Sequence, residues 1–181
     1  QIYYSLQARD AEYELVPLTL DQGLGILVWS PLAGGFLSGK YQGSSPPPEG
    51  TRFAEAGRFV PFDADYGWRV VEAQRKVAAR LGVSPARVAL AWLLGRPAIT
   101  SVIAAARSLE HLEDNLAASD LDLSDEDRRE LEHASNPGIP YPKWMVLQHD
   151  VAEDPRLRTL HPELFTNGGT WEDLRGKAWR G

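Results

Sequence analysis

The sequence predicts an α/β fold with parallel strands, because short apolar segments alternate with capped helical segments along the chain. Parallel strands need long crossover connections, and the helical segments between the apolar ones can supply them. With 181 residues, 43% of them hydrophobic and 24% charged, the chain has the composition of an ordinary globular domain or of a piece of one. We therefore expect a packed core.

Three segments have the composition of strands. Ile2 to Leu6 is rich in β-branched and aromatic residues, and Ile99 to Ala104 has a similar character. Gly25 to Trp29 is continuously apolar, as expected of a strand that helices bury on both faces. The first of these segments begins at the start of the chain, so we expect the chain to begin inside a larger arrangement of strands.

The helical segments carry their own start and stop signals. The first is predicted from an N-cap at Asp10 to about Gln22, with a kink or a late start at Pro17. Apolar residues three or four positions apart predict a second helix, which ends at Gly82. Three further helices are predicted to begin after serine N-caps, the first of them with Pro85 at its first position: Ser84, Ser108 and Ser124.

Two stretches do not fit the alternating pattern. Gln42 to about Asp65 is rich in Pro, Gly and Ser and is too long for a plain connection, which is typical of a lid or a binding loop. After Pro142 the pattern fades. We therefore predict an α/β body over residues 1–142 and a C-terminal tail over residues 143–181.

Composition excludes several classes of function. The formal net charge is -6 with mixed signs, which argues against a nucleic-acid partner. No apolar run approaches the ~18–20 residues that cross a bilayer, so no membrane partner is expected. The chain has no cysteine, which fits a cytoplasmic location. No metal site is predicted, because the histidines lack paired spacing: His111, His133, His149 and His161.

Two strand exits favour an anionic ligand. After Trp29 the chain offers the Ser30 hydroxyl, a glycine-rich stretch that ends at Gly39, and the charge of Lys40. After Ala104 it offers Arg107 and the free N–H groups of the predicted helix start. Because loops at the carboxyl ends of parallel strands build binding sites, two such exits suggest a ligand with more than one phosphate group.

Each of these features also has a purely structural interpretation. Gly34 and Gly35 can form an ordinary turn, Arg107 can be a solvated surface charge, and Trp29 can be a core residue. The run from Gly34 to Lys40 has the glycine and lysine spacing of a P-loop, but Tyr41 stands where Ser or Thr would hold magnesium. The dinucleotide fingerprint GxGxxG is absent from this stretch. The residues alone leave the ligand open.

Several ordered motifs resemble those of the aldo-keto reductase family. They are VWSPLAGGFLSGKY at Val28 to Tyr41 and IAAARSLEHLEDNL at Ile103 to Leu116, together with the opening QIYYSLQARDAE and RVALAWLLGRP. The resemblance extends to about residue 142. It implies a (β/α)8 TIM barrel that reduces carbonyl compounds with NADP(H), of which this chain would hold about strands six to eight, an incomplete barrel.

The resemblance also implies roles for single residues. Gln1 matches the strand-six glutamine that touches the nicotinamide amide, and Trp29 matches the aromatic residue stacked on the nicotinamide ring. The family's pyrophosphate loop corresponds to Ser30, Pro31, Leu32, Ala33 and Gly34.

Further matches concern the phosphates and the adenosine. Lys40 and Arg52 match basic residues that reach the phosphates in some members, and Ala105 and Arg107 fall in the 2′-phosphate loop. The residues implied near the adenosine are His111, Asp114 and Asn115. Many members have Gly in place of Ala105 and Gln or Arg in place of His111, so NAD and NADP both stay open.

The family's catalytic Asp, Tyr, Lys and His lie earlier in its barrel than the part that this chain matches. Tyr3 and Tyr4 match no catalytic residue, and we expect them to pack. Without the acid that protonates the forming alkoxide, hydride transfer loses about 10²–10⁴-fold of assistance. We therefore expect no catalytic residue here and no carbonyl reductase activity of the chain alone. Three hypotheses follow: part of an enzyme that takes a small carbonyl substrate, including half of a split enzyme whose partner is a complementary N-terminal barrel segment; an NADPH-sensing or partner-docking module; and a non-functional remnant.

Overall fold

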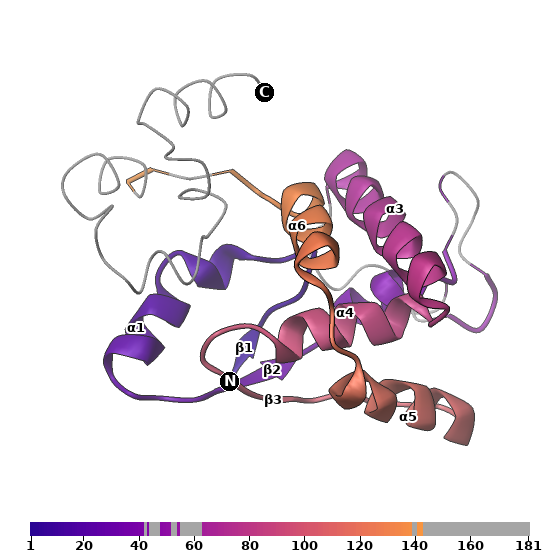
Figure 1. Cartoon of the computed structure of the whole chain (residues 1–181), viewed down its shortest axis with the longest axis horizontal. Coiled ribbons are helices and arrows are strands. Elements are labelled where there is room, and N and C mark those ends of the chain that lie inside the picture. Colours follow the sequence, from indigo (N-terminus) through magenta and orange to yellow (C-terminus); the bar gives the residue numbers. More distant parts are fainter. Residues whose placement is uncertain (42, 44–47, 52–53, 55–62, 139–140, 143–181) are drawn as a thin grey trace.

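The computed structural model describes residues 1–41, 43, 48–51, 54, 63–138 and 141–142. Its strands are β1 (Ile2–Tyr3), β2 (Ile26–Trp29) and β3 (Ile99–Val102). Its helices are α1 (Leu15–Asp21), α3 (Ala64–Leu81), α4 (Pro85–Leu94), α5 (Leu109–Leu116) and α6 (Asp125–Ala134), and its 3-10 turns are η1 (Asp10–Glu12), η2 (Ala33–Ser38) and η3 (Ala117–Asp120) (Figure 1). The predicted C-terminal tail and most of the predicted long loop lie outside the described residues.

The described strands form one parallel sheet in the order β1-β2-β3. Ile2 pairs with Val28 across β1 and β2, and Val28 pairs with Val102 across β2 and β3. The prediction of parallel strands joined by helices is therefore confirmed for this part of the chain. All carboxyl ends of the strands point to the same edge, which is where sites form in such sheets.

The helices cover one face of the sheet. Ile26 and Val28 of β2 are buried, whereas Leu27 between them is 43% exposed, because successive side chains of a strand point to opposite faces. The expectation that β2 is buried on both faces is wrong in this structure. A continuous apolar run cannot by itself show whether both faces are covered.

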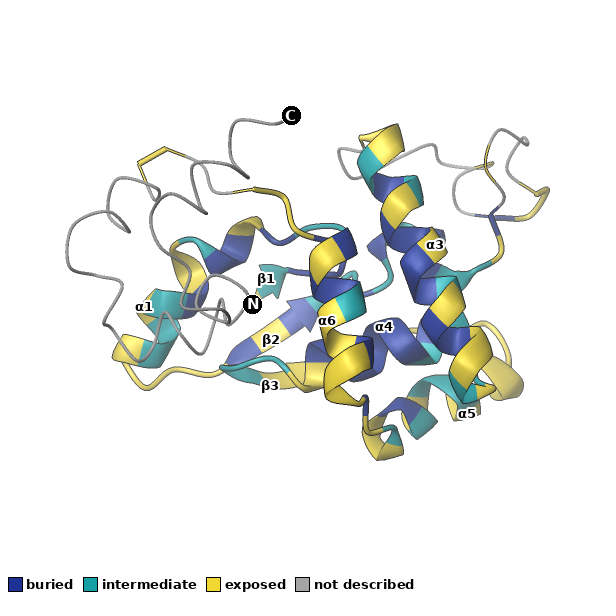
Figure 2. Ribbon diagram, turned by 45° about the horizontal axis from the view of Figure 1, so that its top comes forward, coloured by how far each residue is buried: buried dark blue, intermediate teal, exposed yellow. Residues whose placement is uncertain are grey.

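Helix α4 occupies the centre of the core. Its residues from Ala86 to Leu93 are buried apart from Arg87, and Figure 2 shows most of the helix coloured as buried. Val70 and Val77 of α3 pack into the same cluster. Helix α5 differs, because none of its residues is buried. It lies at the periphery, beside α4 (Figure 2).

The predicted helix starts are confirmed by their hydrogen bonds. The side chains of Ser84, Ser108 and Ser124 each accept a bond from a backbone N–H three residues later. Pro85 stands at the first position of α4. Gly82 ends α3 with a φ of 67°, a conformation that glycine adopts without strain. Local chemistry alone decided these boundaries.

Three boundaries differ from expectation. β1 ends at Tyr3 instead of Leu6, because the chain turns and the backbones of Ser5 and Ala8 exchange hydrogen bonds. The segment that follows divides into η1 and α1, so Asp10 caps no helix. The predicted late start at Pro17 is confirmed, because α1 begins at Leu15 and Pro17 lies in its first turn. β3 ends at Val102, two residues early.

Among the described residues, no single helix has the length and apolar character needed to cross a membrane. Only α3 and α4 taken together, across a bend of 99°, meet both criteria.

Candidate functional site

The loops that leave β2 and β3 start from the same edge of the sheet. The two strands are parallel neighbours, and the N–H of Ile103, just past β3, donates to the carbonyl of Val28 at 2.8 Å. Further along, Nη1 of Arg107 donates to the carbonyl of Gly50 at 2.7 Å. The loop after β3 therefore reaches the stretch of chain that follows Lys40. The two loops that carry the predicted residues therefore leave the sheet at one edge.

The loop after β2 is folded tightly by its own hydrogen bonds. The N–H of Gly34 donates to Oγ of Ser30 at 3.1 Å, and the N–H of Gly35 donates to the carbonyl of Leu32 at 2.9 Å. Gly34 and Gly35 have φ values of 67° and 96°, a left-handed region that glycine adopts without strain. Pro31 and Ala33 are buried, so they pack under the loop. These two glycine amides shape the turn, and an anion here would need other donors.

Lys40 supplies a cationic donor beside this turn. Its side chain is exposed, and Nζ lies 3.2 Å from the position that a Cβ on Gly35 would occupy. Nζ also lies 5.3 Å from the centre of the Tyr41 ring, a favourable cation–π distance. The ammonium group is thus folded back over the loop. The hydroxyl of Ser30 can still donate its proton while it accepts from Gly34.

Trp29 opens onto a cleft of about 810 Å³ that Gln1 and Tyr3 also line. The rings of Tyr3 and Trp29 lie 5.0 Å apart, tilted by 31°, as neighbours across β1 and β2. Burial raises the pKa of Tyr3 above its ordinary value. Trp29 is half-buried and Gln1 is exposed, so both can present surface to a planar group in this cleft. Asp10 and Glu14 line another part of it.

The residues predicted on and before α5 fall into two groups. Ala105, Arg107 and His111 are exposed at the start of the helix, whereas Asp114 and Asn115 are half-buried. The carboxylate of Asp114 accepts from the guanidinium of Arg87 at 2.7 and 3.0 Å and from the hydroxyl of Ser84. Its implied contact with adenosine therefore competes with partners on α4. Arg52 lies outside the described residues.

A buried ionic cluster, which we define as Tyr4, Arg9, Glu12, Arg96 and Glu132, was not predicted from the sequence. Arg9 donates to the carboxylates of Glu12 and Glu132, each at 2.8 Å. Arg96 contacts the same two carboxylates. The hydroxyl of Tyr4 donates to Glu12 at 2.5 Å and accepts from Nε of Arg96 at 3.0 Å. The cluster joins the segment after β1 to α6 and to the turn before β3.

The two arginines of the cluster keep the carboxylate of Glu12 charged. Burial alone would raise the pKa of Glu12, but the attraction of Arg9 and Arg96 outweighs it and holds the pKa below the ordinary value. Trp92 contacts both arginines, whose guanidinium carbons are 5.5 and 5.0 Å from the centre of its ring. The only local signal was the spacing of Arg9 and Glu12, three residues apart. The cluster is structural, since all its charges are paired within the protein.

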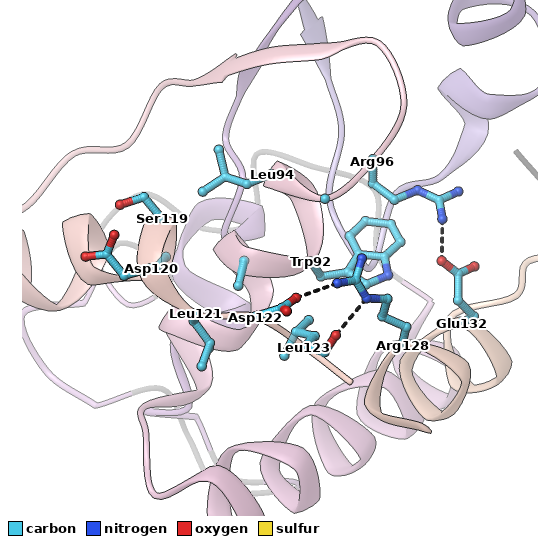
Figure 3. A pocket seen from close by; sticks show the side chains of 13 residues that line it. Trp92, Leu94, Arg96, Ser119, Asp120, Leu121, Asp122, Leu123, Arg128 and Glu132 are labelled. Atoms are coloured by element: carbon cyan, nitrogen blue, oxygen red, sulfur yellow. Dashed lines mark hydrogen bonds and ion pairs between the residues drawn. The ribbon is translucent and has the colours of Figure 1, made fainter. Parts of the chain in front are cut away.

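A second cavity, of about 330 Å³, lies where α4 ends and α6 and η3 approach it. Figure 3 shows its polar groups facing one another: Arg128 bonds Asp122 and the carbonyl of Leu123 at 2.8 Å, and Arg96 pairs with Glu132. The cavity opens beyond the turn that precedes β3, whereas the two loops leave from the other ends of the strands. It is therefore separate from the candidate site.

Comparison with known proteins gives the family. The family model described as "Aldo/keto reductase family" matches residues 1–136. The chain belongs to the aldo/keto reductase family. Members of this family have (β/α)8 barrels and generally use NAD(P)H, and the small parallel sheet with its covering helices agrees with part of such a fold.

Relatives of this aldo/keto reductase chain include proteins named as oxidoreductases and as potassium channel beta subunits. It is 38% identical over 123 residues to an uncharacterized oxidoreductase, YrpG of Bacillus subtilis, covering 68% of this chain and 36% of the relative. It is 36% identical over 157 residues to the uncharacterized oxidoreductase Mb2320 of Mycobacterium bovis, covering 84% and 46%. A probable voltage-gated potassium channel subunit beta of Arabidopsis thaliana is 35% identical over 125 residues, covering 65% and 37%.

A solved structure shares the fold. The thermostable aldo-keto reductase Tm1743, crystallised with the inhibitor epalrestat, superposes with a TM-score of 0.51 at 22% identity, over 74% of this chain and 38% of that protein. The chain thus spans less than half the length of these relatives.

Proposed function

We propose that this chain is the cofactor-binding part of an NADP(H)-dependent aldo-keto reductase, which reduces aldehydes or ketones by hydride transfer. The single observation that carries the proposal is that the loops after β2 and β3 leave neighbouring parallel strands at one sheet edge. There Arg107 bonds the carbonyl of Gly50, so the loop after β3 contacts the chain that continues from the loop after β2. NADPH carries a central pyrophosphate and a 2′-phosphate on its adenosine ribose, and two adjacent strand exits can contact these two separate groups.

The described residues fit such a cofactor chemically. Lys40 and Arg107 are exposed cations at this edge, and Arg107 can form paired hydrogen bonds to a phosphate. Trp29 and Gln1 line the cleft of about 810 Å³, where a planar nicotinamide could lie. Bound NADPH supplies a hydride. In this proposal Trp29 orients the ring, Gln1 holds its amide, and the cations neutralise the phosphates.

We further propose that a complementary N-terminal barrel segment completes the structure and carries the catalytic Asp, Tyr, Lys and His. Apolar side chains exposed at both edges of the described structure support this. They are Leu15 and Leu18 on α1, Leu27 on the open sheet face, and Leu109 and Leu116 on α5. Exposed leucines on these elements are available to pack against a further element of the fold. The chain alone is then inactive, and the carbonyl substrate is chosen largely by residues outside it.

A second candidate is an NADPH-binding module without turnover. The relatives named as probable potassium channel beta subunits, from Arabidopsis thaliana and Oryza sativa, favour this alternative at 35% and 37% identity. Such a module would use the same nucleotide site and differ only in the chemistry that follows.

Nucleotide binding tests the proposal. Titration with NADPH, followed by its fluorescence, should show saturable binding, and Arg107→Leu should weaken it about tenfold or more, because a charge-assisted contact contributes about 1.5–3 kcal/mol. Arg129→Leu, which changes an exposed arginine on α6, is the matched control and should bind as the wild type does. Absence of binding would sink the proposal.

Turnover assays separate the alternatives. The purified chain should not oxidise NADPH with a simple aldehyde, and turnover there would contradict our placement of the catalytic residues. Turnover after mixing with the complementary segment supports a split enzyme. Binding without turnover after mixing supports the sensor. A remnant would show neither binding nor cooperative melting.

A further inference from the structure

We infer that the first turn of α4, Ser84–Arg87, positions both ends of the dinucleotide site: Gln74 ties it to the loop after β2, and the Arg87–Asp114 ion pair ties it to α5. The inference rests on the proposed function and deepens it. It assigns Gln74, Arg87 and Asp114 as positioning residues, which act on the cofactor through the loops that they hold.

Gln74 makes the first tie. Its side chain is fully buried on α3, and Nε2 donates to the carbonyl of Leu37 at 2.8 Å and also to the carbonyl of Pro85. Leu37 belongs to the loop after β2, and Pro85 begins α4. One amide group therefore joins the loop to the helix. Because the group is buried, water cannot replace either bond when the amide is removed.

The end of the same loop packs directly on α4. A Cβ on Gly39 would lie 2.7 Å from Cγ of Pro85, and Gly39 has a φ of 85°. Only glycine allows this approach. Nη2 of Arg75 on α3 also donates to the carbonyl of Gly39 at 3.2 Å. The position of the loop, and with it that of Lys40, thus follows the position of this first helical turn.

The Arg87–Asp114 ion pair makes the second tie. Nε and Nη2 of Arg87 donate to Oδ1 of Asp114 at 3.0 and 2.7 Å. Ser84 donates to the other oxygen of Asp114 while it accepts from the backbone N–H of Arg87 at 3.0 Å. The hydroxyl group of Ser84 therefore caps α4 and also holds Asp114 of α5. Both carboxylate oxygens of Asp114 are engaged by α4.

Helix α5 depends on this anchor more than a core helix would. None of its residues is buried, and its leucines face outward, Leu109 with 69% of its surface exposed. Apolar packing within the described structure therefore holds α5 weakly. The start of α5 follows Arg107, which the resemblance places in the 2′-phosphate loop, and carries His111, which it places near the adenosine. Loosening the ion pair should move these groups and leave the loop after β2 in place.

Breaking the two ties should weaken the binding of NADPH and NADH to different extents. In this protein, Arg87→Gln should raise the Kd for NADPH about three- to tenfold and that for NADH less than about twofold, because only NADPH has the 2′-phosphate. Gln74→Leu should weaken both nucleotides equally, because it loosens the loop near the pyrophosphate. Arg129→Gln, with the same charge change on an exposed position of α6, should alter neither Kd.

The ratio of the two Kd values is the readout, since a general loss of stability would weaken both nucleotides together. Asp114→Asn removes the same ion pair and should give the same selective loss, and the double variant should lose no more than either single one. Asp114→Asn takes the place of Arg87→Gln in this test if Arg87→Gln melts below the assay temperature. Equal weakening of both nucleotides by these variants, additive losses, or a wild type without NADPH preference overturns the inference. A wild type that binds neither nucleotide overturns the proposed function instead.

Discussion

Removing the charge of Glu12 should strongly destabilise the protein. Its side chain is 1% exposed and accepts from Arg9 at 2.8 and 2.9 Å, from Arg96 at 3.1 Å and from Tyr4 at 2.5 Å. Glu12→Gln keeps the shape but leaves two buried guanidinium groups facing one remaining carboxylate, that of Glu132. Breaking a buried ion pair in this way costs about 3–5 kcal/mol. A loss of about 4 kcal/mol raises the unfolding constant about a thousandfold.

The assay is urea unfolding followed by tryptophan fluorescence, with the free energy of unfolding extrapolated to water. Glu113→Gln is the control, because Glu113 is exposed on α5, and it should change the free energy by less than about 0.5 kcal/mol. Adding Arg96→Met to Glu12→Gln rebalances the charges, with one arginine and one carboxylate left, and should recover part of the loss. A loss for Glu12→Gln no larger than that of the control would refute the account of the cluster.

Three further outcomes are expected. The pKa of Glu12 is lower in the folded state than its ordinary 4.5, so its contribution to the free energy of unfolding is complete above pH 4.5 and is lost as the pH falls through the folded-state pKa. Glu12→Gln should therefore make the urea midpoint less dependent on pH in the acid range. Gly39→Ala should cost about 2 kcal/mol or more in melting experiments, whereas Gly23→Ala, with a similar φ but open space around it, should cost about 1. Ser124→Ala should cost about 1 kcal/mol, because it removes the capping box of α6.

The candidate site was predictable where the signals lie in one stretch of chain. The tight turn at Gly34 and Gly35 was one of two interpretations of its glycines, and its φ values agree with that interpretation. The engagement of Asp114 was not predictable, because its partner Arg87 is 27 residues away and nothing near either residue marks the pair. Motif matching placed Asp114 near adenosine, whereas the structure gives its carboxylate partners on α4.

By itself, the sequence determined the helix boundaries at Ser84, Ser108 and Ser124, because capping acts over a few residues. It also predicted parallel strands, from the alternation of apolar and helical segments. Only the tertiary structure decided which face of β2 is covered, since the apolar run of a strand does not show whether one face or both are covered by helices. It also decided the buried ionic cluster, in which Arg9 meets Glu132 across 123 residues. Charges this far apart in the chain are paired only when the chain folds, and no local sequence pattern predicts their ion pair.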